Sequence, residues 1–344
     1  MQLKRLWDTL SFFEVIPFAN CLNQLFNPSQ DSITFRKTVM GLTLVCYDGS
    51  VQGRETLSSL REKGIPLRVL NTSNSLPDVD FSRENIEVIN VNLEGDSLNP
   101  SILERVSRII CLPQRGIDKF ISLVEKTLQK GEILLFDFHN QSAINQWGAV
   151  DDIVMGGISS SRLTWKDGVA VFTGEVSTEN NGGFASVRSK NLNPPWDLSG
   201  YEGIRLRIRG DGQRYKFILR CEGKWDGIGY CYSFDSQANS WIDVDIPFRK
   251  LIPVFRAKTV ASAGDFLSSQ VYSFQLMLSK FEYDGKYNPF FRPGPFCLEI
   301  ESIKAYGGHN SPQLILIGNT SQWQDYLSHT PTLDTVYGDI PIVS

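Results

Sequence analysis

The stretch LTLVCYDGSVQGRETLSSLREKGIPLRVL, residues 42–70, decides the first part of the fold. It opens with an apolar run at 42–48 that predicts a buried strand, and an amphipathic pattern then ends at Gly64. A second apolar run follows at 66–72. A helix between two buried strands is the repeating unit of a parallel sheet. We therefore expect a doubly wound α/β fold to begin here.

The same alternation continues to residue 131. The sequence predicts strands at 86–92 and 108–113 and helices at 97–106 and 116–131. Much later, the short apolar run QLILIG at 313–318 is typical of a central parallel strand. We expect this run to pair in parallel beside the strand at 108–113, so that the segment between them is an inserted domain.

From residue 133 the pattern changes to short alternating strands without a convincing helix. Gly, Asp, Asn and Pro turns separate predicted strands at 133–138, 169–177, 203–210, 215–223, 229–235, 241–247, 272–279 and 296–306. Strands at this spacing predict an antiparallel sandwich or barrel. The expected division is N-terminal amphipathic helices at 1–35, a Rossmann-like domain at 36–132 and 309–344, and a β-sandwich at 133–308.

Composition excludes several classes of protein. The 344 residues suit two domains, and a net charge of -4 argues against nucleic-acid binding. Six scattered cysteines without a CxxC pair indicate free thiols in a reducing compartment, and three histidines exclude a histidine-rich metal site. No run approaches the ~18 apolar residues of a membrane-spanning helix, and a signal-peptide pattern is absent. We expect a protein on the cytoplasmic or stromal side.

The N-terminus is rich in large apolar residues. Leu3, Leu6, Leu10 and Phe13 follow helical spacing, and Pro17 suits the start of a second helix that ends near residue 26. Two interpretations stay open. The helices pack on the body of the protein, or residues 2–26 attach it peripherally to a membrane surface or dock a partner.

Several motifs in the strand-rich region carry a family resemblance. They are WGAVDDIVMGGISSS, FTGEVSTENNGGFASVRS, YEGIRLRIRGDGQRYKF, WIDVDIPF, PVFRAKTV and LMLSKFEYDGKYNPFFRPGPFCLEIESIKAY. Over about residues 134–306 the chain resembles the complex I intermediate-associated protein 30 family. The resemblance implies a galactose-binding-like jelly-roll sandwich, and a role in assembling respiratory complex I without a known catalytic activity.

The flanking segments, 41–132 and 312–320, resemble an atypical short-chain dehydrogenase-like NAD(P)-binding domain. An insertion of the sandwich into such a domain is similar to the plant chloroplast high-chlorophyll-fluorescence factors. This second resemblance implies a photosynthetic or related role in the biogenesis of a membrane complex.

The dinucleotide fingerprint is degenerate. Its glycines let the backbone approach a pyrophosphate at a helix N-terminus. Against the G-x-x-G-x-x-G pattern of the resembled domain, this chain carries Tyr47, Ser50 and Gly53, with Gly49 one place out of register. Thr72 and Asn92 replace two further cofactor-contacting residues, and no tyrosine has a lysine four residues on. The candidate cofactor residues are Gly49, Ser50, Gly53 and Asn92, NADP is the candidate cofactor, and we expect no tight NAD(P) binding because Tyr47 would obstruct the pyrophosphate.

The stretch WGAVDDIVMGGISSSRL, residues 147–163, lacks the lysine of a phosphate-binding Walker loop and the spaced oxygens of an EF-hand. Asp151 and Asp152 together with backbone carbonyls are a candidate calcium site. The alternative is that Asp and Gly supply the conformations of a tight turn, as NNGGF at 180–184 does.

Two loops combine aromatic residues with cations, which is the composition of recognition surfaces. They lie in CEGKWDGIGY (221–230) and EYDGKYNPFFRPGPF (282–296). The alternative is that they only fold over the sandwich core. The candidate partner-binding residues are Lys224, Trp225, Tyr283, Lys286, Tyr287, Phe290, Phe291 and Arg292.

No nucleophile, base and acid occur together in a recognisable motif, so we expect no enzyme. The leading hypothesis is a non-catalytic assembly factor that binds protein subunits or assembly intermediates of a membrane complex through the sandwich. The alternatives are a carbohydrate or small-molecule binding module and a residual NADP-dependent reductase.

Overall fold

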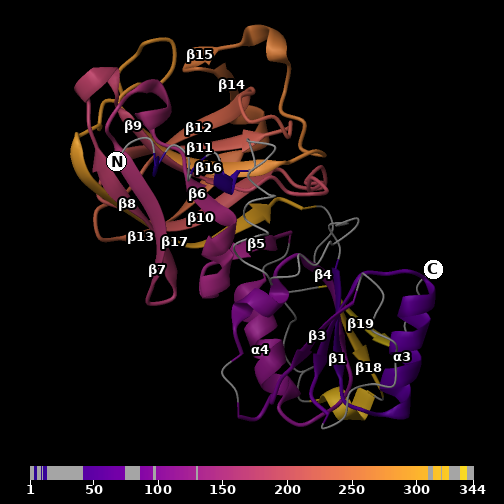
Figure 1. Cartoon of the computed structure of the whole chain (residues 1–344). Coiled ribbons are helices and arrows are strands. Elements are labelled where there is room, and N and C mark those ends of the chain that lie inside the picture. Colours follow the sequence, from indigo (N-terminus) through magenta and orange to yellow (C-terminus); the bar gives the residue numbers. More distant parts are fainter. Residues whose placement is uncertain are drawn as a thin grey trace. The chain divides into compact units, whose positions relative to one another are not determined.

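The computed structural model describes residues 4, 5, 9, 11–13, 42–73, 86–95, 98–128, 131–308, 313–318, 320–324 and 334–338. The chain divides into two compact units. One contains residues 1–32 and 137–303, and the other contains residues 33–136 and 304–344 (Figure 1). The fold as described is mostly β, with one parallel sheet and two antiparallel sheets.

The second unit is built on a parallel sheet with the spatial order β19-β18-β4-β1-β2-β3. The interior strands are short, apolar and buried, as a sheet covered on both faces requires. Their bounds are β1 Leu42–Tyr47, β2 Leu67–Asn71, β3 Ile86–Asn90, β4 Val106–Cys111, β18 Gln313–Ile317 and β19 Asp334–Gly338.

The strand QLILIG lies where the sequence predicts it. β18 pairs in parallel with β4, with Leu314 opposite Ile109 and Leu316 opposite Cys111. The prediction of this pairing is confirmed. The sheet is therefore completed by a strand that follows the sandwich in the sequence.

In the part of this unit that the structure describes, two α-helices accompany the sheet, α3 Val51–Glu62 and α4 Ile117–Thr127. The predicted helix at 97–106 is wrong, because only the single 3-10 turn Pro100–Leu103 forms there. Arg105 has φ of 61°, a left-handed conformation that an α-helix cannot include, and β4 begins at Val106. The N–H of Arg105 donates a hydrogen bond to the carbonyl of Leu134 instead of continuing a helix.

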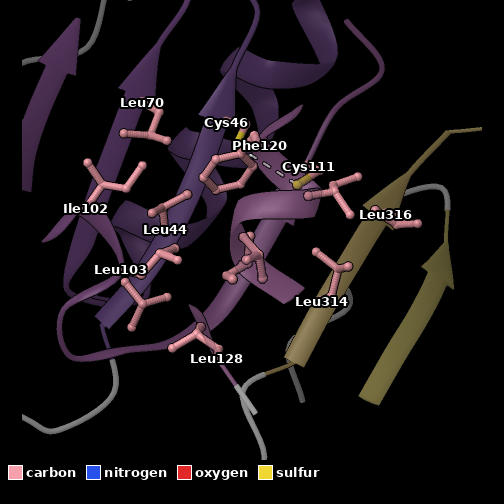
Figure 2. Close-up of a cluster of buried hydrophobic side chains, with 14 of the residues drawn as sticks. Leu44, Cys46, Leu70, Ile102, Leu103, Cys111, Phe120, Leu128, Leu314 and Leu316 are labelled. Carbon is pink, nitrogen blue, oxygen red and sulfur yellow. Dashed lines mark hydrogen bonds between the residues drawn. The ribbon is translucent and has the colours of Figure 1, made fainter. Parts of the chain in front are cut away.

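One core cluster lies between the sheet and α4 (Figure 2). Phe120 of α4 points toward Cys46 and Cys111, whose Sγ atoms are 4.0 Å apart on neighbouring strands. Both thiols are fully buried. Burial raises the pKa of Cys46 well above its usual value, so this thiol is part of the packing rather than a reactive group.

The first unit contains two antiparallel sheets. The first sandwich sheet has the order β13-β10-β17-β8-β7, with β5 also paired to β17, and the second has the order β15-β14-β12-β11-β16-β9-β6. The strands of the first are β5 Ile133–Asp137, β7 Ser160–Lys166, β8 Val169–Val176, β10 Gly203–Arg209, β13 Trp241–Pro247 and β17 Gly294–Tyr306. Those of the second are β6 Trp147–Ala149, β9 Phe184–Ser189, β11 Arg214–Arg220, β12 Gly229–Asp235, β14 Ile252–Phe255, β15 Lys258–Thr259 and β16 Ser273–Ser279.

Aromatic side chains fill the space between the two sandwich sheets. Phe172 of β8 lies 6.3 Å from Tyr215 of β11 and 4.9 Å from Phe296 of β17, measured between ring centroids. Because successive side chains of a strand point to opposite faces, Tyr215 on the inner face places Lys216 on the outer face of the second sandwich sheet. That outer face carries the candidate site.

The N-terminal segment is helical at Lys4, Arg5, Thr9, Ser11 and Phe12. The second helix predicted after Pro17 lies outside the described residues. Among the helices that the structure does describe, none combines the length and the apolar composition needed to cross a membrane.

Candidate functional site

The loop after β6 is built around two buried carboxylates. Asp151 accepts the N–H of Ser161 at 2.9 Å, its hydroxyl at 2.5 Å and the N–H of Ser186 at 3.1 Å. Arg5 adds an ion pair at 3.0 Å. Asp151 thereby joins the start of β7 to β9. Burial raises the pKa of Asp151, against the lowering effect of these hydrogen bonds and of Arg5.

Asp152 fastens the neighbouring turn. It accepts the N–H of Ser159 at 2.9 Å, of Gly183 at 2.7 Å and of Phe184 at 3.2 Å. A Cβ at Gly157 would lie 2.4 Å from this carboxyl group, and one at Gly182 would lie 2.6 Å from its Oδ2. One glycine of each GG motif, Gly157 and Gly182, therefore makes room for Asp152.

The carboxylate oxygens of Asp151 and Asp152 therefore accept hydrogen bonds from donors within the protein. Within the described residues, no group of three or more His, Cys, Asp or Glu side chains is arranged to hold a metal ion. The calcium site at Asp151 and Asp152 stays an untested prediction. At the tip of the loop the side chain of Met155 is 73% exposed.

The outer face of the second sandwich sheet carries both polar and apolar side chains and is largely buried. One row across the strands places Gly148, Arg188, Gln275, Ile218 and Cys231 side by side. Arg188 is 3% exposed. A buried cation on the outer face of a sheet requires covering groups that satisfy it, and two loops supply them.

The first covering loop is residues 221–228, here called the Trp225 loop. Arg188 donates to the carbonyl of Trp225 at 3.0 Å, to Asn191 Oδ1 at 3.2 Å and to Ser273 Oγ at 3.2 Å. Its guanidinium also lies 5.4 Å from the centroid of the Trp225 ring. Burial, and then the charge of Arg220, lower the pKa of Arg188 to about 9, so it stays charged at neutral pH.

Trp225 is half-buried rather than free, and Lys224 beside it is exposed. Lys224 pairs with Glu222 at 3.0 Å. Arg220 donates to the carbonyl of Gly227 at 2.9 Å, which ties the other end of the Trp225 loop to β11. Trp225 therefore acts partly as a cover for the sheet.

The second covering loop is residues 280–292, here called the aromatic loop. Lys216 of β11 donates to the carbonyls of Phe281 and Glu282, both at 2.6 Å, and its ammonium lies 4.7 Å from the centroid of the Tyr283 ring. Burial lowers the pKa of Lys216. The Tyr283 hydroxyl lies 3.0 Å from Ser233 Oγ, so Tyr283 points toward the sheet.

The aromatic loop is anchored at its other points as well. Asp284 accepts the N–H and hydroxyl of Thr259 at 2.8 and 2.7 Å, and these two bonds lower the pKa of Asp284. Asn288 donates to the carbonyls of Arg214 and Ser279 at 2.9 and 3.0 Å. Arg292 donates to the carbonyl of Asp211 at 2.8 Å.

These anchors hold aromatic side chains on the surface. Tyr287 is 75% exposed, and its ring packs on Phe281 with 5.1 Å between centroids. Phe290 is 49% exposed, Lys286 is exposed and Phe291 is half-buried. A rigid loop that exposes two large aromatics beside cations has the chemistry of a protein-binding surface.

The parallel sheet carries a second candidate site at the carboxyl ends of its strands. A crevice of about 730 Å³ is lined there by Asp48, Asn71, Thr72, Ser73, Asn90, Val91, Asn92, Leu93, Glu94, Gln114 and Arg115. Ser50 caps α3 by accepting the N–H of Gly53 at 3.0 Å. Asp48 Oδ1 accepts the N–H of Ser50 at 3.0 Å, so a carboxylate already lies at the helix terminus where a pyrophosphate would bind.

The expected obstruction by Tyr47 is wrong. Tyr47 is 1% exposed and packs in the core with Leu57 and Leu60, because its side chain points away from the crevice. Gly53 packs against it, since a Cβ there would lie 3.0 Å from the Tyr47 ring. Gly49 has φ of 84° and serves the turn after β1. Asn92 accepts two backbone N–H groups of its own turn.

Sequence reasoning missed the groups that organise the sandwich face, Gly148, Arg188 and Lys216. The only signal was a cation at an alternating strand position, which ordinarily marks a solvated face. Of the two interpretations of the N-terminal segment, the described residues support packing on the body of the protein, because Phe12 and Phe13 contact this unit. Phe13 lies 5.1 Å from Trp225 between ring centroids.

The first unit is thus an antiparallel β-sandwich module with a covered polar face and anchored surface loops. Residues 136–300 match the complex I intermediate-associated protein 30 family. An uncharacterised protein of Schizosaccharomyces pombe, C9E9.15, is 31% identical over 173 residues, covering 46% of this chain and 76% of that protein. The chain belongs to the complex I intermediate-associated protein 30 family.

A second relative is named complex I intermediate-associated protein 30, mitochondrial, from Drosophila melanogaster. It is 24% identical over 190 residues, covering 49% of this chain and 61% of the Drosophila protein. Among solved structures, the family 11 carbohydrate-binding module of the Clostridium thermocellum cellulase Lic26A-Cel5E is 21% identical with a TM-score of 0.39. That match covers 52% of this chain and 96% of the module, and we infer no ligand from it.

Proposed function

We propose that this protein is a non-catalytic assembly or biogenesis factor for a membrane electron-transfer complex, of the complex I or photosynthetic type. The observation that carries this proposal is the family membership of residues 136–300, which span nearly all of the sandwich. The name of the Drosophila relative supports the same role. The partners are protein subunits or assembly intermediates of that complex.

The aromatic loop is the proposed contact surface. Tyr287 and Phe290 project from a loop that Lys216, Asp284 and Asn288 hold in place. A side chain held in its bound position loses little entropy on binding, so the free energy of its burial contributes to affinity. Lys286 and Arg292 add positive charge at the rim, where charge sets orientation and association rate.

For the fold, we infer a galactose-binding-like jelly roll inserted in a degenerate dinucleotide-binding domain of the plant high-chlorophyll-fluorescence type. The strand order β3-β2-β1-β4-β18-β19 supports the second part, because it is the order of doubly wound dinucleotide-binding sheets. We also infer that no dinucleotide binds tightly. Asp48 at the start of α3 supports this, since a fixed carboxylate there repels a pyrophosphate.

We further infer peripheral attachment to the membrane on its cytoplasmic or stromal side, with residues 2–26 as the contributing segment. Affinity purification of the tagged full-length protein from membranes, followed by mass spectrometry, tests the function. We expect subunits of one electron-transfer complex to be enriched over a tag-only control. Enrichment of unrelated soluble proteins, or of none, would contradict the proposal.

A further inference from the structure

The N-terminal segment lies across the outer face of the second sandwich sheet, and its contacts follow helical spacing. Arg5, Thr9, Phe12 and Phe13 stand at positions i, i+4, i+7 and i+8, which share one face of a helix. The N–H of Phe13 bonds the carbonyl of Thr9 at 3.2 Å, as it does in an α-helix. In Figure 1 this indigo segment lies in front of the sheet near β6 and β16.

Each of these four residues meets a matching group on the sandwich. Arg5 pairs with Asp151 at 3.0 Å, and Thr9 donates to the carbonyl of Ala149 at 3.2 Å. The guanidinium of Arg188 is 5.9 Å from the Phe13 ring. The surface of the sandwich that makes these contacts is called the seat below. Its residues are Gly148, Ala149, Asp151, Arg188, Lys190 and Trp225.

Phe12 fits the seat because residue 148 is glycine. A Cβ at Gly148 would lie 2.5 Å from Phe12 Cδ1. On the other side, the ammonium of Lys190 lies 4.6 Å from the centroid of the Phe12 ring. The missing Cβ and the cation together form a shallow site for one aromatic ring.

At the buried side of the seat, the fixed side chain of Arg188 contacts two aromatic rings. Arg188 is fixed by Ser273, Asn191 and the Trp225 carbonyl, and its flat guanidinium contacts both the Trp225 and Phe13 rings. Helix-in-groove recognition by protein domains uses this arrangement of i, i+4 and i+7 anchors. Arg5, Phe12 and Phe13 nevertheless keep partly exposed surface after docking.

We propose that the N-terminal segment, which docks through Arg5, Thr9, Phe12 and Phe13, is a detachable intramolecular ligand and that a client's amphipathic helix binds in the same seat. The client helix carries a cation for Asp151 and, seven and eight residues later, two aromatic side chains. This inference rests on the proposed function for the existence of a client, but the seat itself does not depend on it. A segment of the same chain competes at a high effective concentration, so it must leave before the client enters.

The test uses full-length protein with Phe12→Ala and Phe13→Ala, which removes both rings from the intramolecular ligand. A fluorescent synthetic peptide of residues 1–16 is titrated into this variant and into the wild type. We expect binding to the variant at least tenfold tighter than to the wild type, whose own segment occupies the seat. Gly148→Ala in the variant background should abolish the gain, and Lys4→Ala, at an exposed position, is the matched control in the wild-type background.

Thermal melting first establishes that the variant folds. If it does not, Arg5→Ala replaces it, because loss of the ion pair with Asp151 weakens docking while the rings remain. Equal peptide affinity for wild type and folded variant would overturn the proposal. So would gained binding that Gly148→Ala leaves intact.

Capture of client subunits from membranes is the second arm. The variant should capture several-fold more than the wild type, and equal or lower capture would overturn the competition between segment and client. If neither form captures any subunit, the proposed function fails and the client part of the inference fails with it. The peptide titration then still decides whether the N-terminal segment is a detachable ligand.

Discussion

Asp152 Oδ2 lies 2.7 Å from the N–H of Gly183, and this bond joins the two glycine-rich turns of the sandwich. The carboxylate is 1% exposed, and a Cβ at Gly157 or Gly182 would collide with it. The relationship explains why each of the two turns carries a glycine, Gly157 or Gly182, next to the Asp152 carboxylate. One buried carboxylate therefore accepts backbone N–H groups from both turns.

Asp152→Ala should therefore reduce stability. It leaves the N–H groups of Ser159, Gly183 and Phe184 without their acceptor, and each such loss costs about 1–3 kcal/mol. We expect the free energy of unfolding in urea to fall by roughly 3 kcal/mol or more. Glu179→Ala, at an exposed position in the adjoining turn, is the control and should change little. Unchanged stability with lost client capture would show that the loop is a functional site, and calcium would be tested there first.

Trp225→Ala should also lower stability, because Trp225 covers a buried cation instead of projecting freely. Loss of its ring from Arg188 and from Phe13 should cost about 1–2 kcal/mol. Lys224→Ala changes the neighbouring exposed side chain and should stay within about 0.5 kcal/mol of the wild type. Urea unfolding of both variants measures the difference, and equal stabilities would show that the contact of Trp225 with Arg188 contributes nothing.

The thiols should differ in reactivity with exposure. Cys297 is exposed, whereas Cys46, Cys111 and Cys231 are buried. Burial raises the pKa of Cys231 to about 11, so at pH 8 about one molecule in a thousand carries the reactive thiolate even before access is considered. Among these four thiols, alkylation of native protein followed by peptide mass spectrometry should find Cys297 modified first. Cys297→Ser should remove that early product, and early modification of Cys231 would contradict its placement in the sheet.

Dinucleotide titration tests the crevice of the parallel sheet. Because Asp48 bonds the N–H of Ser50 at the start of α3, a phosphate there would meet a like charge at close range. Calorimetry with NADP and with NAD should give no tight binding to the wild type. Asp48→Asn keeps an acceptor and removes the charge, so any residual affinity should rise. A low-micromolar dissociation constant for the wild type would contradict this account of the site.

Strand and helix patterns in the sequence predict the sheets well because burial determines them. The runs at 229–235 and 241–247 coincide with β12 and β13, and QLILIG pairs with β4 as expected. The helix predicted at 97–106 was wrong because Pro100 and the left-handed Arg105 limit it to one turn. Apolar periodicity does not report such a local backbone conformation.

The candidate site was less predictable because it depends on contacts across the sequence. Composition of the aromatic loop could not show that Tyr283 faces Lys216 while Tyr287 faces solvent. The N-terminal segment docks through Arg5, Thr9, Phe12 and Phe13, which do not form a purely apolar stripe. The hydrophobic pattern of the sequence therefore could not predict which residues of the sandwich they contact. Membrane attachment through residues 2–26 stays a prediction, although Phe12 and Phe13 pack on protein in this structure.

We propose above that the sandwich binds membrane-complex subunits through the aromatic loop. The most direct test compares capture from membranes by wild type, by the Tyr287→Ala and Phe290→Ala double variant, and by Leu267→Ala. Leu267 is 50% exposed, close to the 49% of Phe290, but lies outside this loop. At equal amounts of folded protein, we predict at least tenfold lower capture by the double variant, because two anchoring aromatics contribute more than about 1.4 kcal/mol. Leu267→Ala should capture as the wild type does. Equal capture by all three proteins would contradict the account.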